Sequence, residues 1–118
     1  MKKGLKMKEE YKILNDMGYS NDKIDTLLSL GYTIKDILKI NRKTNIIATY
    51  SNKSIIDKFN YLLSLGFSKI ETISITTICP QIYCYKQDSI KTKFDNLMSL
   101  GYTYEEVKIM IINYPAIL

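Results

Sequence analysis

The chain has 118 residues, 46% of them hydrophobic, no His, and a net charge of +5 from 17 Lys plus Arg against 12 Asp plus Glu. This length and apolar content favour a single packed domain over residues 1–118 and argue against disorder. Without His the chain lacks the commonest general base and neutral metal ligand, so we expect no enzyme activity, cofactor, metal or small-molecule substrate, while the positive charge permits a polyanionic partner.

The first residues and the cysteines bear on the compartment. Met-Lys-Lys at the start is followed by alternating Lys and Glu, not by the apolar run of a signal peptide. The longest apolar run, residues 109–112, is far shorter than the roughly 20 residues of a membrane-spanning helix. Cys79 and Cys84 have neither zinc-ligand nor redox-pair spacing. We therefore expect a cytoplasmic protein with two reduced, half-buried thiols and no membrane contact.

A repeat with a period of 35 residues organises the chain. A motif of Leu or Met, Gly, an aromatic residue and Ser or Thr occurs at residues 17–20, 30–33, 65–68 and 100–103. Residues 31–65 and 66–100 share 11 identical positions in 35, which is several times what chance gives. We predict a degenerate first repeat over residues 1–30, full repeats over 31–65 and 66–100, and an incomplete repeat over 101–118.

Each full repeat predicts two helices and a turn. Ile55, Phe59 and Leu62 have the spacing of one helix face, and Gly66 then supplies the left-handed residue that ends a helix. A Ser or Thr followed three positions later by an acid predicts a capping box at Thr33, Ser68 and Thr103. The second helix stops near a turn-forming residue, which is Asn45, Pro80 or Pro115. The pattern predicts an all-α, right-angle-stacked helical-repeat solenoid of about three 35-residue units.

The order of these motifs resembles the repeat of the mitochondrial transcription termination factor (mTERF) family. The resemblance is closest over residues 55–82 and 90–118, which contain Ile-x-x-Lys-Phe-x-x-Leu, Leu-Gly-aromatic-Ser/Thr and Pro-x-Ile in order. It implies repeats of two helices and a short 3₁₀ turn, stacked into a curved superhelix that binds nucleic acid along a basic groove to regulate gene expression. The chain departs from the family in having few units, one Arg, no organellar presequence and Asn45 at a proline position.

The basic residues suggest where such a surface would lie. Four of them share one face of the predicted helix after residue 33, namely Lys35, Lys39, Arg42 and Lys43. This row suits a phosphate backbone, although it carries no sequence readout. The equivalent residues of the next repeat are not basic, so the alternative of a solvated helix face stays open.

Lys58 and Lys93 are the basic residues that recur between the two full repeats, and Lys58 falls inside the apolar stripe of its helix. One interpretation is that its ammonium reaches carbonyls at the end of a neighbouring helix or turn, which would join consecutive repeats. The other is that Lys58 and Lys93 project into a groove and meet phosphate. Both residues are included in the predicted nucleic-acid site on the second interpretation.

Nine of the ten tyrosines divide into two groups. Five occupy repeat positions and are expected to pack in the interior: Tyr19, Tyr32, Tyr50, Tyr85 and Tyr102. Four have no such position and are better candidates for a surface: Tyr61, Tyr83, Tyr104 and Tyr114. Stacking on single-stranded bases is the function that exposed tyrosines would suggest.

The C-terminal residues are apolar where a solenoid needs a polar cap. We expect residues 107–118 to fold back as a cap, to contact another chain, most simply a second copy in a symmetric dimer, or to be the truncated end of a longer unit. The residues expected in such a dimer interface are Ile109, Ile112, Tyr114, Ile117 and Leu118.

Two functions follow from this sequence. The first is a small mTERF-like protein that binds nucleic acid, with a duplex favoured, in a gene-regulatory role. The alternative is a protein-interaction solenoid that acts through a partner or a homodimer and binds no nucleic acid.

Overall fold

The computed structural model describes the backbone of residues 2–118 and the side chains of residues 7–118, and this part of the chain contains helices and no strand. The elements are α1 (Lys2–Asp16), α2 (Asn21–Leu30), α3 (Ile34–Lys43), α4 (Ile46–Thr49), α5 (Asn52–Ser64), α6 (Lys69–Ile78), the 3₁₀ helix η1 (Pro80–Cys84), α7 (Gln87–Ser99), α8 (Tyr104–Asn113) and the 3₁₀ helix η2 (Pro115–Ile117).

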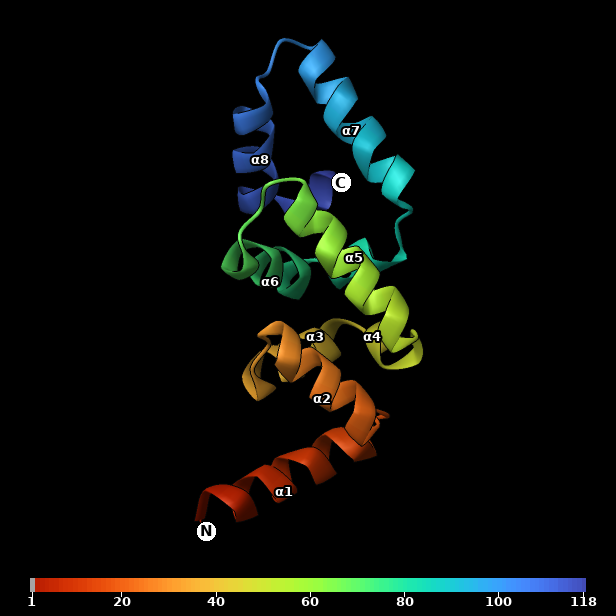
Figure 1. Cartoon of the computed structure of the whole chain (residues 1–118), viewed down its shortest axis with the longest axis vertical. Coiled ribbons are helices and arrows are strands. Elements are labelled where there is room, and N and C mark those ends of the chain that lie inside the picture. The colour runs from red at the N-terminus through yellow and green to blue at the C-terminus, as the bar shows by residue number, and fades with distance from the viewer. Residues whose placement is uncertain (1) are drawn as a thin grey trace.

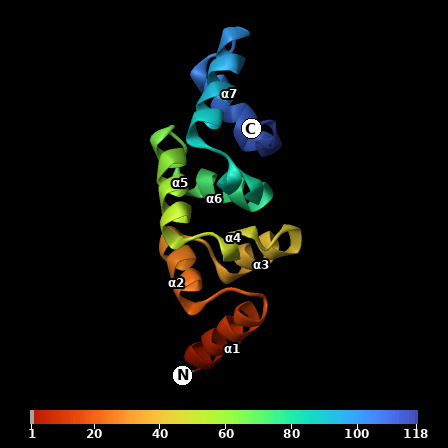
Figure 2. The ribbon, with the colours of Figure 1, turned by 90° about the vertical axis from the view of Figure 1, so that its right-hand side faces the viewer.

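The helices stack into an elongated solenoid that measures 54 × 24 × 22 Å. Helices α2, α5 and α7 follow one another along one side of the molecule, and α3, α4 and α6 extend from the other side (Figures 1 and 2). The predicted all-helical repeat fold is therefore confirmed, because helices of one kind pack on each other from step to step: α3 on α6, α6 on α8, and α2 on α5.

The local signals that predicted helix ends are also confirmed. Capping boxes form at Thr33, Ser68 and Thr103, where each side chain accepts from a backbone N–H three residues later and the acid at that position accepts in return. The glycine of each motif has a positive φ, between 100° and 113°. At Gly31 both hydrogen bonds of a Schellman motif form, from Gly31 N to Leu28 O and from Tyr32 N to Leu27 O.

The prolines begin the short turns as predicted. Cys79 and Tyr114, the residues before Pro80 and Pro115, leave the helical region at φ −130° and −139°. Each proline then opens a 3₁₀ helix. Asn45, which stands at the proline position of the preceding unit, precedes a single α-turn instead.

Helix α2 explains why the first repeat is short. Its N-cap Ser20 accepts from Lys23 N, as the Ser or Thr before a second helix does in the later repeats. Its C-terminus, at Leu30 and Gly31, has the glycine turn that ends a first helix. One helix thus serves as the second helix of the degenerate repeat and the first helix of the next.

Two apolar clusters form the core. The N-terminal cluster gathers α1 to α5 and Tyr83 of η1 around buried residues such as Leu14, Ile37 and Phe59. The C-terminal cluster gathers α5 to η2 around residues such as Leu62, Phe94 and Ile111. The C-terminus folds back onto this second cluster, so that Ile117 and Leu118 pack against it and η2 lies beside α6 (Figure 1).

Because the C-terminus folds back, part of the predicted dimer interface is covered by the chain itself. Ile112, Ile117 and Leu118 are half-buried against the core of their own chain. Ile109 and Tyr114 remain exposed, at 56% and 72%. The cap that we expected as one alternative is therefore present, and only two of the five named residues keep an open apolar surface.

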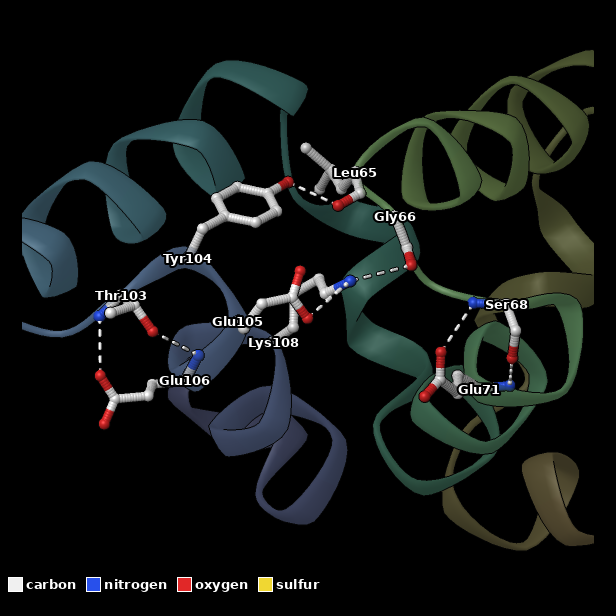
Figure 3. Close-up of polar contacts among 9 residues, drawn as sticks. All are labelled: Leu65, Gly66, Ser68, Glu71, Thr103, Tyr104, Glu105, Glu106 and Lys108. Atoms are coloured by element: carbon white, nitrogen blue, oxygen red, sulfur yellow. Dashed lines mark hydrogen bonds and ion pairs between the residues drawn. The ribbon is translucent and has the colours of Figure 1, made fainter.

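Consecutive repeats meet at the glycine turns. The Tyr104 hydroxyl donates to Leu65 O at 2.5 Å, and the Lys108 ammonium donates to Gly66 O at 3.2 Å while pairing with Glu105 at 3.3 Å (Figure 3). At Gly31 an added Cβ would lie 3.0 Å from Ile73 Cδ1. Gly31 and Gly66 thus each end one helix and also allow side chains of the next repeat to pack closely against the turn.

Several predictions for the tyrosines were wrong. Tyr83, expected at the surface, is buried at 6% exposure, because its hydroxyl pairs with that of Tyr32 at 2.6 Å and Tyr32 also pairs with Thr76. Tyr104 is half-buried on Leu65, and Tyr61 is half-buried as well. Tyr102, expected to pack, is 43% exposed.

Candidate nucleic-acid interface

Helix α3 carries a group of exposed basic side chains. Its capping box at Thr33 fixes where the helix begins, and Ile37 and Ile40 turn one face into the core. The opposite face then presents Lys35, Lys39 and Arg42, all exposed. Among the side chains of residues 7–118, none of these three lies within ion-pair distance of an acid. We call Lys35, Lys39 and Arg42 the α3 basic row.

Lys43 lies on the same helix but has a structural contact. Its ammonium donates to Thr77 O and Ile78 O, both at 2.9 Å, at the C-terminal end of α6. A cation at this end of a helix satisfies unpaired carbonyls and interacts favourably with the helix dipole. Lys43 therefore ties α3 to α6, and we leave it out of the α3 basic row.

The face that is basic on α3 changes its character along the solenoid. The positions equivalent to Lys35 and Lys39 are Ile70 and Ser74 on α6, and Glu105 and Ile109 on α8. All of these side chains are exposed, with Ile70 at 81%. This face is thus basic on α3, uncharged on α6 and acidic at Glu105 on α8. The basic residues therefore do not form a groove that repeats in every unit.

A shallow groove separates α3 from α6. It has a volume of about 370 Å³ and is lined by Asp36 and Lys39 from α3 and by Ile70, Ile73 and Ile78 among the α6 residues. Lys39 therefore stands at the edge between the α3 basic row and an apolar strip.

The lysine position that recurs between the two full repeats has a third member, outside the two repeats that were compared in the sequence. Counted back from the glycine of each motif, Lys23 of α2 occupies the same position as Lys58 and Lys93. Lys23 is 4% exposed, and its ammonium donates to the carbonyl of Tyr50 at the end of α4. This contact is the link to a neighbouring turn that we considered for Lys58, and it occurs in the preceding repeat. Desolvation by burial lowers the pKa of Lys23.

Lys58 and Lys93 do not join the α3 basic row. Lys58 is 8% exposed and lines a cavity beside Cys84 and Lys86, and burial lowers its pKa. Lys93 is half-buried on α7. The predicted site residues are therefore divided among an exposed row on α3, an anchor at Lys43, a buried amine at Lys58 and the separate Lys93.

Sequence reasoning missed the hydroxyl cluster of Tyr32, Thr76 and Tyr83, which joins the turn after α2 to α6 and η1, 44 and 51 residues further along the chain. No periodic signal identifies Tyr83, because its counterpart in the preceding repeat is Ala48. Cys84, expected to be half-buried, is exposed, whereas Cys79 is half-buried. Sequence reasoning could have identified Lys23, since it precedes Gly31 by the same number of residues as Lys58 precedes Gly66.

The described residues contain neither a candidate metal site nor a membrane-spanning helix. Among the described side chains, no group of three or more His, Cys, Asp or Glu residues is placed to hold a metal ion. None of the described helices has the length and apolar character needed to cross a membrane.

The comparisons with known proteins agree with the repeat pattern. The family model described as mTERF matches residues 5–118. No curated protein gives a significant sequence match to the chain.

Proposed function

The chain belongs to the mTERF family of nucleic-acid-binding helical-repeat proteins, and on that premise we propose that it binds a nucleic-acid duplex through backbone phosphates in a gene-regulatory role. The contacts would come from the α3 basic row. Such contacts fix the position and orientation of a protein on a duplex but do not read its sequence.

The observation that supports this proposal is that three cationic side chains, unpaired among the residues that the structure describes, lie on one exposed face of α3. Lys35, Lys39 and Arg42 are exposed, and no acid among the described side chains neutralises them. Their span of seven residues covers about 10 Å along the helix axis. A duplex carries one negative charge per about 1.7 Å of axis, so several phosphates come within reach of the row.

A protein partner is the second candidate, and the exposed isoleucines favour it. Ile70 and Ile78 of α6 are 81% and 51% exposed, and Ile109 of α8 is 56% exposed, all on the face that continues from the α3 basic row. Large exposed apolar side chains grouped on one face are typical of protein-binding surfaces. This function would use α6 and α8 and would not need the cations of α3.

The experiment that separates the two functions measures binding to labelled duplex and single-stranded DNA and RNA at low salt. The test variant replaces Lys35, Lys39 and Arg42 with Gln. The control variant replaces Lys8, Lys53 and Lys91, which are exposed on other helices, and so has the same net charge. We expect the α3 variant to lose at least tenfold in affinity for duplex and the control to lose much less.

Equal losses in both variants would mean that net charge alone drives binding, which contradicts the role of α3. No binding to any of the four nucleic acids at low salt would exclude the proposed function. In that case the isoleucine face of α6 and α8 becomes the surface to test.

A further inference from the structure

A second polar site lies away from α3, where α5, η1 and α7 meet. A cavity of about 320 Å³ opens there, and its lining includes Ser54, Asp57 and Lys58 of α5 together with Tyr85, Lys86 and Gln87 at the start of α7. It shares no residue with the α3 basic row or with the groove between α3 and α6.

The first unusual feature of this cavity is Lys58. Its side chain is more than nine-tenths buried, yet its ammonium makes no hydrogen bond or ion pair with any described residue. The equivalent Lys23 donates to the carbonyl of Tyr50. Tyr85, the repeat counterpart of Tyr50, is on the cavity wall but receives no such bond. The ammonium itself opens into the cavity, so burial of the stem only partly desolvates it, and a ligand that accepts its hydrogen bonds offsets the cost of that desolvation.

The second feature is the N-terminus of α7, a helix of 13 residues. The helices α2, α3, α5, α6 and α8 each begin with a Ser or Thr side chain that accepts from their own first turn. The N-cap of α7 is Lys86, whose side chain cannot accept, and both Lys86 and Gln87 line the cavity. Free N–H groups at a helix N-terminus, together with the helix dipole, form a favourable site for an anion.

Acidic residues near the cavity limit what can bind. Asp57 lies on its wall with a largely exposed carboxylate that pairs with Lys53 at 3.7 Å, and Asp88 is in the first turn of α7. Lys58 and Lys86 oppose these charges, and Ser54 adds a hydroxyl donor. A compact oxyanion with several acceptor atoms fits donors that converge from two helices, because phosphate oxygens accept strongly from ammonium and backbone N–H groups.

We propose that this cavity binds one phosphate group, held by the Lys58 ammonium and by the N-terminus of α7 with Lys86. The phosphate can belong to a bound nucleic-acid strand or to a free phosphate ion. In the first case the inference rests on the proposed function and adds a second contact surface to it. In the second case it stands independently of nucleic-acid binding.

The test is a titration of the full chain with inorganic phosphate, followed by ¹H–¹⁵N NMR, with chloride at matched ionic strength as the reference. We expect saturable shifts at the backbone amides of Gln87 and Asp88. Lys58→Met keeps the apolar stem but removes the ammonium, and should weaken phosphate binding at least tenfold. Lys91→Met, on the exposed surface of α7, is the matched control and should leave the affinity unchanged.

A second variant tests the same site without touching its buried lysine. Asp57→Asn removes a negative charge from the cavity wall and should tighten phosphate binding several-fold. Shifts spread over all lysine-rich surfaces, an equal loss in Lys58→Met and Lys91→Met, or no saturation at tens of millimolar phosphate would overturn the proposal.

The source of the phosphate is assigned by titrating Lys58→Met with duplex. A loss of duplex affinity assigns the site to the nucleic-acid backbone, and an unchanged affinity assigns it to free phosphate. The α3 variant distinguishes the two proposals, because it should bind inorganic phosphate as the wild type does. If phosphate binds at α7 but no nucleic acid binds, the proposed function fails and the phosphate site stands.

Discussion

At the scale of single residues, a tyrosine buried between repeats makes the stability of the fold depend on pH. Tyr32 is 2% exposed, and its hydroxyl pairs with Tyr83 at 2.6 Å and with Thr76. Burial raises the pKa of Tyr32 to about 12, whereas the unfolded chain ionises at its ordinary value near 10. The folded state therefore holds a proton that the unfolded state has lost in this range, so stability falls as the pH rises from about 10 to about 12.

The corresponding prediction compares wild type with Tyr32→Phe in urea denaturation at about pH 9 and at about pH 12. We expect the variant to be less stable at the lower pH, because Tyr83 and Thr76 lose a partner. It should also lose less stability than the wild type on going to the higher pH, by about 2 kcal/mol. An identical loss in both proteins would show that Tyr32 ionises as easily when folded as when unfolded.

The glycines provide a second residue-scale prediction. Gly31 and Gly101 have similar positive φ values of 113° and 104°, but an added Cβ meets Ile73 Cδ1 at 3.0 Å only at Gly31 and finds open space at Gly101. Gly101→Ala should cost about 1–2 kcal/mol for the left-handed backbone. Gly31→Ala should cost about 1 kcal/mol more for the crowded contact. Thermal unfolding measures both, and equal costs would contradict the close approach of α6.

At the scale of the elements, Lys43 shows how a side chain from one helix completes another. The carbonyls of Thr77 and Ile78 at the end of α6 accept from its ammonium. Lys43→Met should lower the free energy of unfolding by about 1 kcal/mol, because these carbonyls lose a charged donor. Lys35→Met, at an exposed position on the same helix, should change it by much less. Similar stabilities of the two variants would argue that Lys43 is as free as Lys35.

The elements also show which features the sequence could predict. The caps at Thr33 and Ser68 and the stop at Pro80 depend on residues within four positions of each other, so local patterns were sufficient. The sequence did not predict that α2 belongs to two repeats. Two overlapping repeat motifs in one helix look the same as a repeat that has lost residues. The burial of Tyr83 and the free ammonium of Lys58 depend on neighbours from other repeats, which no periodicity specifies.

At the scale of the whole molecule, the folded-back C-terminus closes the second apolar cluster. Ile117 packs against that cluster, whereas Ile109 is 56% exposed. Ile117→Ser should therefore destabilise the protein by about 1 kcal/mol or more, and Ile109→Ser should have almost no effect on stability. Native-state hydrogen exchange should show the loss first in α6 and α8, the helices that η2 contacts, since each repeat of a solenoid contacts only its neighbours. Equal stability of the two variants would contradict the capping role of η2.

The distribution of charge over the whole solenoid determines what the net +5 can do. The exposed helix face that is basic at Lys35 and Lys39 becomes apolar at Ile70 and acidic at Glu105. A duplex laid along the whole solenoid would meet repulsion near α8, so we expect it to lie across α3. The predicted repeat boundaries and the cytoplasmic location remain predictions at this scale.

The salt dependence of duplex binding tests the central claim most directly. If Lys35, Lys39 and Arg42 each neutralise one phosphate, a plot of log affinity against log salt should have a slope steeper than that of the α3 variant by about 2.7, at about 0.9 per contact. The charge-matched variant at Lys8, Lys53 and Lys91 should keep the wild-type slope. A wild-type slope equal to that of the α3 variant would show that the row makes no phosphate contact and would contradict the proposed function.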